Sequence, residues 1–249
     1  MWLISKNIGD QLIDINHTRR EQEVLLRERV ARLRATRPVI RCRHTVQLDA
    51  EPQRKESTML DLELDEQYQD LVNLVRDFAQ QVVAPQSAAN DANKTFPYDI
   101  VKQMGELGLF GLPISEEYGG SGGDYFHLAL ALEELGKVDQ SVAITLEAGV
   151  SLGAMPIFRF GSQEQKLRWL PELATGEKLA GFGLTEPGAG SDASAALTRA
   201  RLDGGEWVID GGKEFITNSG TDITSLVTVT AVTGTTENPD GSVRKHIST

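Results

Sequence analysis

The spacing of hydrophobic residues changes near residue 179, and this change constrains the fold of the 249-residue chain more than any other feature. Before it, apolar residues recur every three or four positions, as on one face of a helix. After it, short runs rich in Thr, Val and Ile are separated by Gly-Gly turns, which is typical of strands. Runs of helices followed by runs of strands favour an α+β fold or two separate domains.

The first part divides into five predicted helices with short connections. We expect them over residues 65–84, 97–108, 125–135, 141–160 and 162–175. Asp65 suits the N-cap of the first helix, which we expect to stop before Pro85, because the residue before a proline is disfavoured in helical geometry. We expect Pro156 to kink the fourth helix, and Ser162 with Gln165 makes a capping-box pattern that opens the fifth.

The second part predicts a set of short strands. A short buried strand is expected over 179–184, followed by further strands over 195–202, 207–210, 214–217 and 226–232. The sequence Glu237-Asn-Pro-Asp-Gly241 is typical of a hairpin turn, and one short strand follows it.

The net charge of the chain changes from positive to negative at about residue 58. Residues 1–58 carry 12 Lys/Arg and 8 Asp/Glu, whereas residues 59–249 carry 13 and 28, so the main body is strongly acidic. Nucleic acid binding needs a basic face, and we therefore expect none for the main body. Residues 18–34 place apolar side chains on one stripe of an arginine-rich helix. That pattern fits either a solvated tail or a segment that binds nucleic acid or an acidic surface.

These breaks divide the chain into three parts. We interpret residues 1–58 as a basic extension that is either disordered or not part of the natural protein, with Met59 as the natural start. Its second half, residues 36–58, has few apolar residues and is typical of a disordered linker. Residues 59–178 then form the helical domain, and residues 179–249 form a β domain that we expect to be incomplete.

Composition argues against several other classes of protein and site. The single cysteine, Cys42, rules out an intramolecular disulfide and a cysteine metal cluster, and the four histidines have no ligand-like spacing. No apolar run approaches the ~20 residues of a membrane-spanning helix, and the first residues lack the long apolar stretch of a signal peptide. We therefore expect no metal site, no membrane span and a cytoplasmic location.

The stretch over residues 179–192 is the most informative about function. Its apolar run ends before Pro187, and glycines and hydroxyl-bearing residues follow within a few positions. Such a loop offers free N–H groups, hydroxyls and close backbone approach to phosphates or to the polar edge of a planar cofactor. An ordinary Gly-rich turn at the end of a strand fits the same composition, so composition alone leaves both interpretations open.

A dinucleotide-binding Rossmann fold is the alternative explanation for a glycine cluster. Its fingerprint is G-x-G-x-x-G running from a strand directly into a helix. Gly181 and Gly183 have the first spacing, but Glu186 occupies the place of the third glycine and Pro187 follows it. A strand rather than a helix is predicted beyond the loop. The Rossmann interpretation therefore fails on both counts.

Three motifs in the same order give the chain a family resemblance. The string Phe182-Gly-Leu-Thr-Glu-Pro-Gly-Ala-Gly-Ser-Asp192 closely resembles the flavin-binding signature of the acyl-CoA dehydrogenases. Gly212-Lys-Glu-Phe-Ile-Thr-Asn218 resembles the flavin-stacking strand of that family, and Tyr118-Gly-Gly-Ser-Gly122 resembles its Gly-Gly turn between helices. The resemblance covers roughly Asp61 to the last residue and leaves out the first 58 residues.

The resemblance implies a fold and an FAD site. The fold would be an N-terminal all-helical domain followed by a β-barrel-like middle domain, here truncated and without the C-terminal helical bundle of the family. Phe182, Leu184 and Thr185 would line the flavin ring, Ser191 would face the flavin pyrophosphate and the CoA moiety, and Phe215 would stack near the ring. The implied cofactor-binding residues are Phe182, Leu184, Thr185, Gly190, Ser191, Phe215, Ile216 and Thr217.

The resemblance also implies an activity. A carboxylate base removes the α proton of an acyl-CoA thioester, the β hydride passes to FAD, and a trans-2-enoyl-CoA is released. The family uses electron-transfer flavoprotein as acceptor, assembles as a tetramer and takes part in fatty acid β-oxidation. Its base lies beyond the part that matches this chain, so we expect no catalytic residue here, poor solubility and no dehydrogenation by the chain as written.

Several alternatives stay open at this point. The chain could be a non-catalytic flavin-binding fragment, or it could come from a flavin-dependent monooxygenase or oxidase of the same fold. Glu186 precedes Pro187 in a tight loop and is a poor candidate for the base. For Asp192 we expect hydrogen bonds from loop N–H groups rather than chemistry.

Overall fold

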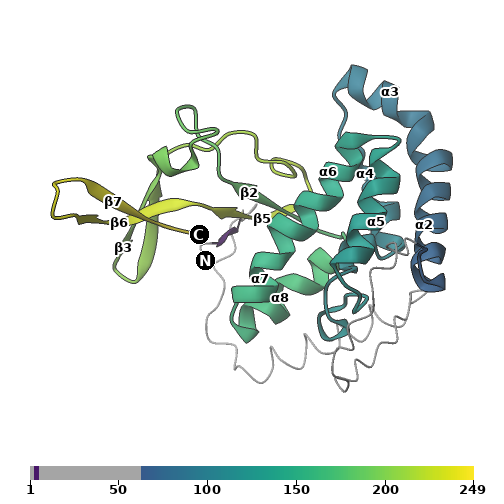
Figure 1. Cartoon of the computed structure of the whole chain (residues 1–249), viewed down its shortest axis with the longest axis horizontal. Coiled ribbons are helices and arrows are strands. Elements are labelled where there is room, and N and C mark those ends of the chain that lie inside the picture. Colours follow the sequence, from purple (N-terminus) through teal and green to yellow (C-terminus); the bar gives the residue numbers. More distant parts are fainter. Residues whose placement is uncertain (1–2, 6–62) are drawn as a thin grey trace, which may run out of the picture.

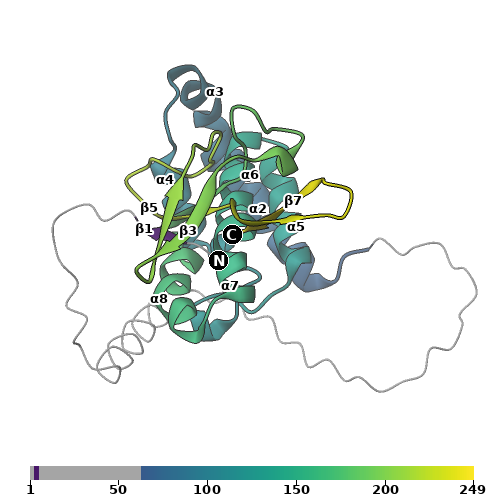
Figure 2. The same cartoon turned by 90° about the vertical axis from the view of Figure 1, so that its left-hand side faces the viewer.

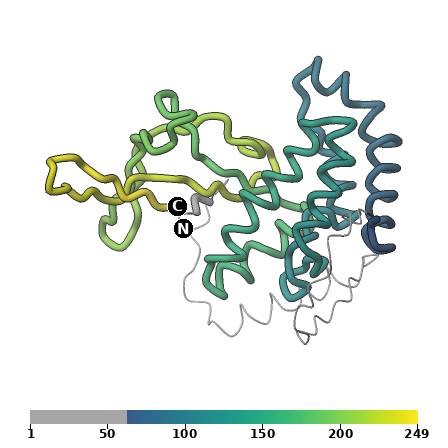
Figure 3. The backbone as a smooth tube through the Cα atoms, in the orientation of Figure 1, coloured from purple at the N-terminus to yellow at the C-terminus, as the bar shows by residue number. Residues whose placement is uncertain are grey.

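The computed structural model of the chain describes residues 3–5 and 63–249. Figure 1 shows the helices gathered on one side and the strands on the other, and the tube in Figure 3 follows the chain from helices to strands in the same view. The turned view of Figure 2 places the strands in front of the helices. Our predictions for residues 18–34 and 36–58, for Cys42 and for Met59 lie outside the described residues.

The helical region follows the predicted order. Its α-helices are α2 (Glu66–Phe78), α3 (Ala84–Asn93), α4 (Tyr98–Glu106), α5 (Tyr125–Gly136), α6 (Gln140–Glu147), α7 (Met155–Phe160) and α8 (Gln163–Ala174). The capping box at the start of α8 is confirmed, because the Ser162 hydroxyl accepts from the Gln165 N–H and the Gln165 side chain accepts from the Ser162 N–H. Asp65 occupies the N-cap of α2 by position, without a side-chain cap bond.

Two helical boundaries differ from the prediction. Pro85 does not end the first helix, because a π-helical turn over Ala79–Val83 connects α2 to α3 and leaves Pro85 in the first turn of α3. A proline is tolerated there, since first-turn N–H groups have no partner within the helix. The fourth helix is irregular ahead of Pro156 rather than at it, with a π-helical stretch over Ala148–Ala154 between α6 and α7.

The π-helical stretch lies directly against the first strand of the β region. A Cβ on Gly153 would come within 2.7 Å of the Ala180 Cβ, so only glycine permits this contact. The continuous helical run Gln140–Phe160 is the one candidate membrane span among the described residues by length and composition, but its most apolar window is 61% buried within the protein. The run therefore packs as a buried helix in the core of the described part of the chain.

One hydrophobic core runs through the helices and into the strands. Its largest fully buried side chains are Ile100, Met104, Leu109, Phe110, Leu112, Ile114, Leu135, Leu146, Ile157, Leu170, Leu179 and Leu226. Leu179 and Leu226 belong to strands, so the first sheet is anchored in the helical core.

The described strands form two sheets. The first has the order β1 (Leu3–Ser5), β5 (Thr224–Val229), β2 (Leu179–Gly183), with β1 antiparallel and β2 parallel to β5. The second has the order β4 (Glu206–Asp210), β3 (Arg199–Asp203), β6 (Ala231–Glu237), β7 (Val243–Ser248). The β6–β7 hairpin around Glu237–Gly241 is as predicted and extends away from the helices in Figure 1.

Several strand predictions need correction. The stretch over 214–217 is irregular rather than a strand, and the predicted strand 226–232 is two strands separated at Thr230. The predicted strand 195–202 begins only at Arg199, after a short helical turn over Ala193–Ala195. Leu3–Ser5 form a strand where the sequence predicts a disordered or extraneous extension.

Gly176 provides a test of the packing between α8 and the loop that precedes β2. Its φ is +67°, and a Cβ there would lie 2.5 Å from the buried Phe110 ring, so Gly176→Ala combines backbone strain with a clash. We expect a loss of about 2–4 kcal/mol in the free energy of unfolding, measured by urea denaturation. Gly204→Ala is the matched control: its φ is +59° but its surroundings are open, so it should lose only about 1 kcal/mol. Equal losses would contradict the clash.

Candidate functional site

Two stretches that are distant in sequence lie side by side at the end of β2. The backbone N–H of Glu214 donates to the Thr185 carbonyl oxygen over 2.8 Å. A Cβ on Gly181 would lie 3.0 Å from both the Ile216 side chain and the Thr217 carbonyl oxygen. The residues from the end of β2 to Thr185 thus run against the irregular segment 213–218. This puts the stretch that contains Phe182, Leu184 and Thr185 beside the segment that contains Phe215, Ile216 and Thr217.

The glycines of the first stretch divide into two groups. Gly181 and Gly183 allow segment 213–218 to lie close to β2. A Cβ on Gly183, for example, would lie 3.2 Å from the Lys213 side chain. Gly188 and Gly190 face open space, because a Cβ on either residue would have no other atom within 4 Å. Gly190 and the neighbouring Ser191 are both exposed on the loop. This second group leaves backbone accessible to a ligand.

Phe215 projects from the site as an exposed aromatic side chain. It is 86% exposed, and its φ of +55° lies in the left-handed region, which is uncommon for an aromatic residue. Leu184 is 40% exposed in the neighbouring stretch. Residues 214–217, which we predicted as a strand, follow an irregular path, so Phe215 and Ile216 do not alternate between the two faces of a sheet. An apolar ring held outward beside a polar, glycine-rich loop suits a flat cofactor with a polar edge.

A buried ion pair joins the two stretches. The Lys213 ammonium donates to Glu186 Oε1 over 2.7 Å, to the Leu184 carbonyl over 2.9 Å and to the Thr230 hydroxyl over 2.9 Å. Glu186 also accepts from the backbone N–H groups of Leu197 over 2.6 Å and Thr198 over 3.0 Å. Both charged side chains are only 6% exposed.

The environment of Glu186 makes it unsuitable as a base. Burial alone would raise the pKa of its carboxyl group, but the hydrogen bonds from Lys213, Leu197 and Thr198 outweigh burial and lower the pKa to about 2. A carboxylate held at that pKa has little tendency to take a proton near neutral pH. The structure therefore supports the expectation that Glu186 is a poor candidate for the base.

Asp192 behaves as predicted and makes local loop contacts. Its carboxylate accepts hydrogen bonds from the N–H and hydroxyl of Ser194. These bonds lower the pKa of the Asp192 carboxyl group, chiefly through the Ser194 hydroxyl. Asp192 thereby caps the short helical turn that follows the Gly-rich loop.

Asn218 is a site residue that our sequence analysis did not identify. It is buried, its φ is +66°, and its Nδ2 donates to the Thr145 carbonyl oxygen over 2.9 Å. Thr145 lies near the end of α6, where the helix passes into its π-helical stretch. An asparagine as the last residue of the motif is a usable signal, because Asn tolerates left-handed φ better than most other non-glycine residues.

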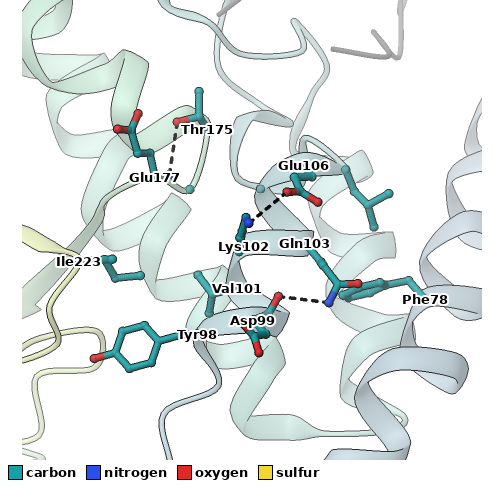
Figure 4. A pocket seen from close by; sticks show the side chains of 13 residues that line it. Phe78, Tyr98, Asp99, Val101, Lys102, Gln103, Glu106, Thr175, Glu177 and Ile223 are labelled. Carbon is teal, nitrogen blue, oxygen red and sulfur yellow. Dashed lines mark hydrogen bonds and ion pairs between the residues drawn. The ribbon is translucent and has the colours of Figure 1, made fainter. Parts of the chain in front are cut away.

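One cavity adjoins this region, and another lies beside α4. The first, of about 500 Å³, adjoins the loop and is lined by Glu186, Pro187, Gly188, Leu197, Thr198, Arg199, Asp210, Gly211 and Gly212. The other, of about 800 Å³, lies beside α4 and is drawn in Figure 4, where Tyr98, Val101 and Ile223 stand around it. None of the predicted cofactor residues lines either cavity. No group of His, Cys, Asp and Glu among the described residues could hold a metal ion.

Comparison with known proteins identifies two domains. Residues 65–177 match the acyl-CoA dehydrogenase N-terminal domain, and residues 181–247 match the acyl-CoA dehydrogenase middle domain. A probable acyl-CoA dehydrogenase of Bacillus subtilis is 48% identical over 182 residues, which are 73% of this chain and 47% of the relative. The chain therefore spans about half the length of this relative.

Solved structures give the same picture. Butyryl-CoA dehydrogenase from Megasphaera elsdenii has a TM-score of 0.66 at 38% identity, covering 76% of this chain and 49% of its own. A chain reported with the electron transferring flavoprotein of Acidaminococcus fermentans has a TM-score of 0.65 at 39% identity, with the same coverage of 76% and 49%. An acyl-CoA dehydrogenase complexed with FAD and a glutaryl-CoA dehydrogenase in complex with FADH2 are among the similar structures.

The low pKa of Glu186 predicts an acid-sensitive site. A carboxyl group whose pKa falls from 4.5 to about 2 on folding adds stability that is present above about pH 4.5 and is lost as the pH falls through 2. The full contribution is about 3 kcal/mol. Removing the titrating group should flatten the dependence of stability on pH in this range. Glu186→Gln should therefore show a flatter profile between about pH 5 and pH 2, measured as urea midpoint against pH.

The matched control is Glu106→Gln. Glu106 is 63% exposed and its ion pair with Lys102 spans 4.0 Å, so its loss should leave the profile nearly unchanged. Wild-type and Glu186→Gln profiles of equal slope would contradict the assigned pKa.

Proposed function

The chain belongs to the acyl-CoA dehydrogenase family, and we propose that it supplies most of the FAD-binding residues of a protein that dehydrogenates acyl-CoA thioesters. The observation that carries the proposal is the contact between the two motif stretches, with Phe215 held outward beside Leu184. FAD is the cofactor of similar solved structures, and the exposed ring, the open glycines and the accessible hydroxyls fit it.

Each residue of the site would have a distinct part in holding the cofactor. Phe215 would stack against the ring system, and Phe182 and Leu184 would line its edge. The hydroxyls of Thr185 and Thr217 would donate to the polar atoms of the ring. Gly190 and Ser191 would bind the pyrophosphate, because an open loop with free N–H groups and a hydroxyl suits that group.

The chemistry needs two agents, one at each carbon of the Cα–Cβ bond next to the thioester. Bound FAD would accept the hydride from the β carbon, and the protein would fix its position. A carboxylate would take the α proton. We propose that this base lies in another part of the protein, since Glu186 is buried, paired with Lys213 and held at a low pKa.

Membership of the acyl-CoA dehydrogenase family also suggests an electron acceptor, an assembly and a location, which we give here as proposals. We propose electron-transfer flavoprotein as the electron acceptor, a homotetramer as the assembly and the cytoplasm as the location. A similar solved chain reported with an electron transferring flavoprotein supports the first of these. The acyl chain is proposed to be short, because one similar solved structure is a butyryl-CoA dehydrogenase.

Anaerobic flavin reduction tests the function in a protein that carries this sequence together with the base. Butyryl-CoA, octanoyl-CoA and palmitoyl-CoA are added without oxygen, and loss of the oxidised flavin absorbance is followed. We expect butyryl-CoA to bleach the flavin fastest. A flavin that no acyl-CoA reduces would contradict the proposal. It would favour a monooxygenase or oxidase of the same fold.

Phe215 should contribute directly to FAD affinity. A stacking contact contributes about 1 kcal/mol beyond buried area, so Phe215→Ala should weaken FAD binding by at least about fivefold in a fluorescence titration. Phe160→Ala is the matched control, because Phe160 is 82% exposed but lies in α7, away from the motif stretches. An unchanged FAD affinity in Phe215→Ala would refute the stacking role.

Thr217 should affect reduction more than binding. Thr217→Ala removes one hydroxyl donor while the neighbouring ring stack remains, so FAD affinity should fall by less than about threefold. Flavin reduction by acyl-CoA should slow by about tenfold or more, because the hydrogen bond acts on the reacting ring. Rapid anaerobic mixing of the FAD-loaded protein measures this rate. A normal rate would remove Thr217 from the site.

A further inference from the structure

Lys213 connects three separate segments through one charged atom. Its ammonium donates to Leu184 at the end of β2, to Glu186 in the loop and to Thr230 between β5 and β6. Lys213 itself begins the segment that carries Phe215. A single side chain therefore fixes the distance between the two halves of the proposed flavin site.

Glu186 extends this connection to the far end of the loop. It accepts from the N–H groups of Leu197 and Thr198, so the loop is closed onto itself through one carboxylate. Lys213 and Glu186 are each 6% exposed, and separating them would leave an unpaired buried charge. The buried pair thus fixes the distance between loop 184–198 and segment 213–218.

The segment after Lys213 is held at its other end by Asn218. Asn218 Nδ2 donates to the Thr145 carbonyl oxygen of α6 over 2.9 Å. Phe215 and Thr217 lie between the two anchors, and both side chains are exposed. An exposed side chain has little packing of its own, so its position depends on the backbone anchors on either side.

We propose that Glu186 and Lys213 are positioning residues that clamp loop 184–198 to segment 213–218 at the spacing that FAD requires, with Asn218 as the second anchor. The identity of the ligand rests on the proposed function. The clamp itself is a property of the chain and can be measured without FAD. Neither charged residue takes part in the chemistry.

The experiment removes the charge of Glu186, the charge of Lys213, or both charges, in the full chain. The variants are Glu186→Gln, Lys213→Met, the double variant and Asn218→Gly, which keeps the positive φ but removes the bond to Thr145. The matched control is Glu134→Gln, because Glu134 is 5% exposed and pairs with Arg76 and Lys137 within the helical domain. Three quantities are measured: the FAD dissociation constant, the urea midpoint and hydrogen exchange of the Glu214 amide.

The Glu214 amide reports the clamp without any ligand. It donates to the Thr185 carbonyl and so bridges the two stretches directly. We expect both single variants to lose stability, to bind FAD at least about tenfold more weakly and to exchange this amide at least about tenfold faster. Asn218→Gly should weaken FAD binding about threefold or more.

The double variant separates positioning from simple stability. It leaves no unpaired buried charge, so it should regain much of the urea midpoint while FAD affinity and Glu214 protection stay low. Glu134→Gln should lose stability with FAD affinity within about twofold of wild type. A double variant that binds FAD like wild type, or keeps the Glu214 amide protected, would overturn the proposal.

The remaining outcomes are also decisive. If wild type does not bind FAD, the proposed function fails, and the Glu214 exchange of the double variant alone decides the clamp. If a single variant does not fold, the double variant supplies the comparison. If the double variant does not fold either, the pair maintains the fold rather than the spacing, and the positioning role is refuted.

Discussion

The contact between Lys213 and Glu186 is the interaction on which the candidate site depends. A buried ion pair is stable only when its desolvation is offset by good geometry and by partners for the remaining donors and acceptors. Here the ammonium has three acceptors, and the carboxylate accepts from two backbone N–H groups besides the lysine. An apolar pair of similar size could fill the space but could not hold three segments at set distances.

The Lys213–Glu186 pair can form only because glycines let the chain approach β2 closely. Segment 213–218 reaches the end of β2 because Gly181 and Gly183 have no side chains in its way. On the other side of β2, Gly153 lets the π-helical stretch lie against Ala180. The strand is therefore in close contact with the chain on both sides. The helical core positions β2, and β2 in turn positions the loop and the segment that face the proposed cofactor.

Periodicity predicted the parts of the fold that depend on burial. The bounds of α4, α5 and α8 agree with the predicted helices within one or two residues, since their apolar stripes face one core. The family motifs also marked the two stretches that lie side by side in the structure. What the sequence could not show is set by tertiary contacts: the π-helical connection before Pro85, and the left-handed φ of Phe215. Segment 213–218 has the composition of a strand, but hydrogen bonds from Lys213, Glu214 and Asn218 hold it in an irregular path.

Phe215 can stay exposed because buried residues on either side of it hold its backbone in place. An aromatic side chain left 86% exposed forgoes about 2–3 kcal/mol of burial free energy in the chain alone. Its backbone does not need that burial, because Lys213 and Asn218 hold the segment on either side of it. A flat ligand that covers the ring can gain the missing burial without first ordering the loop. Buried anchors and an apolar ring left at the surface would thus give the proposed site its shape before a ligand binds.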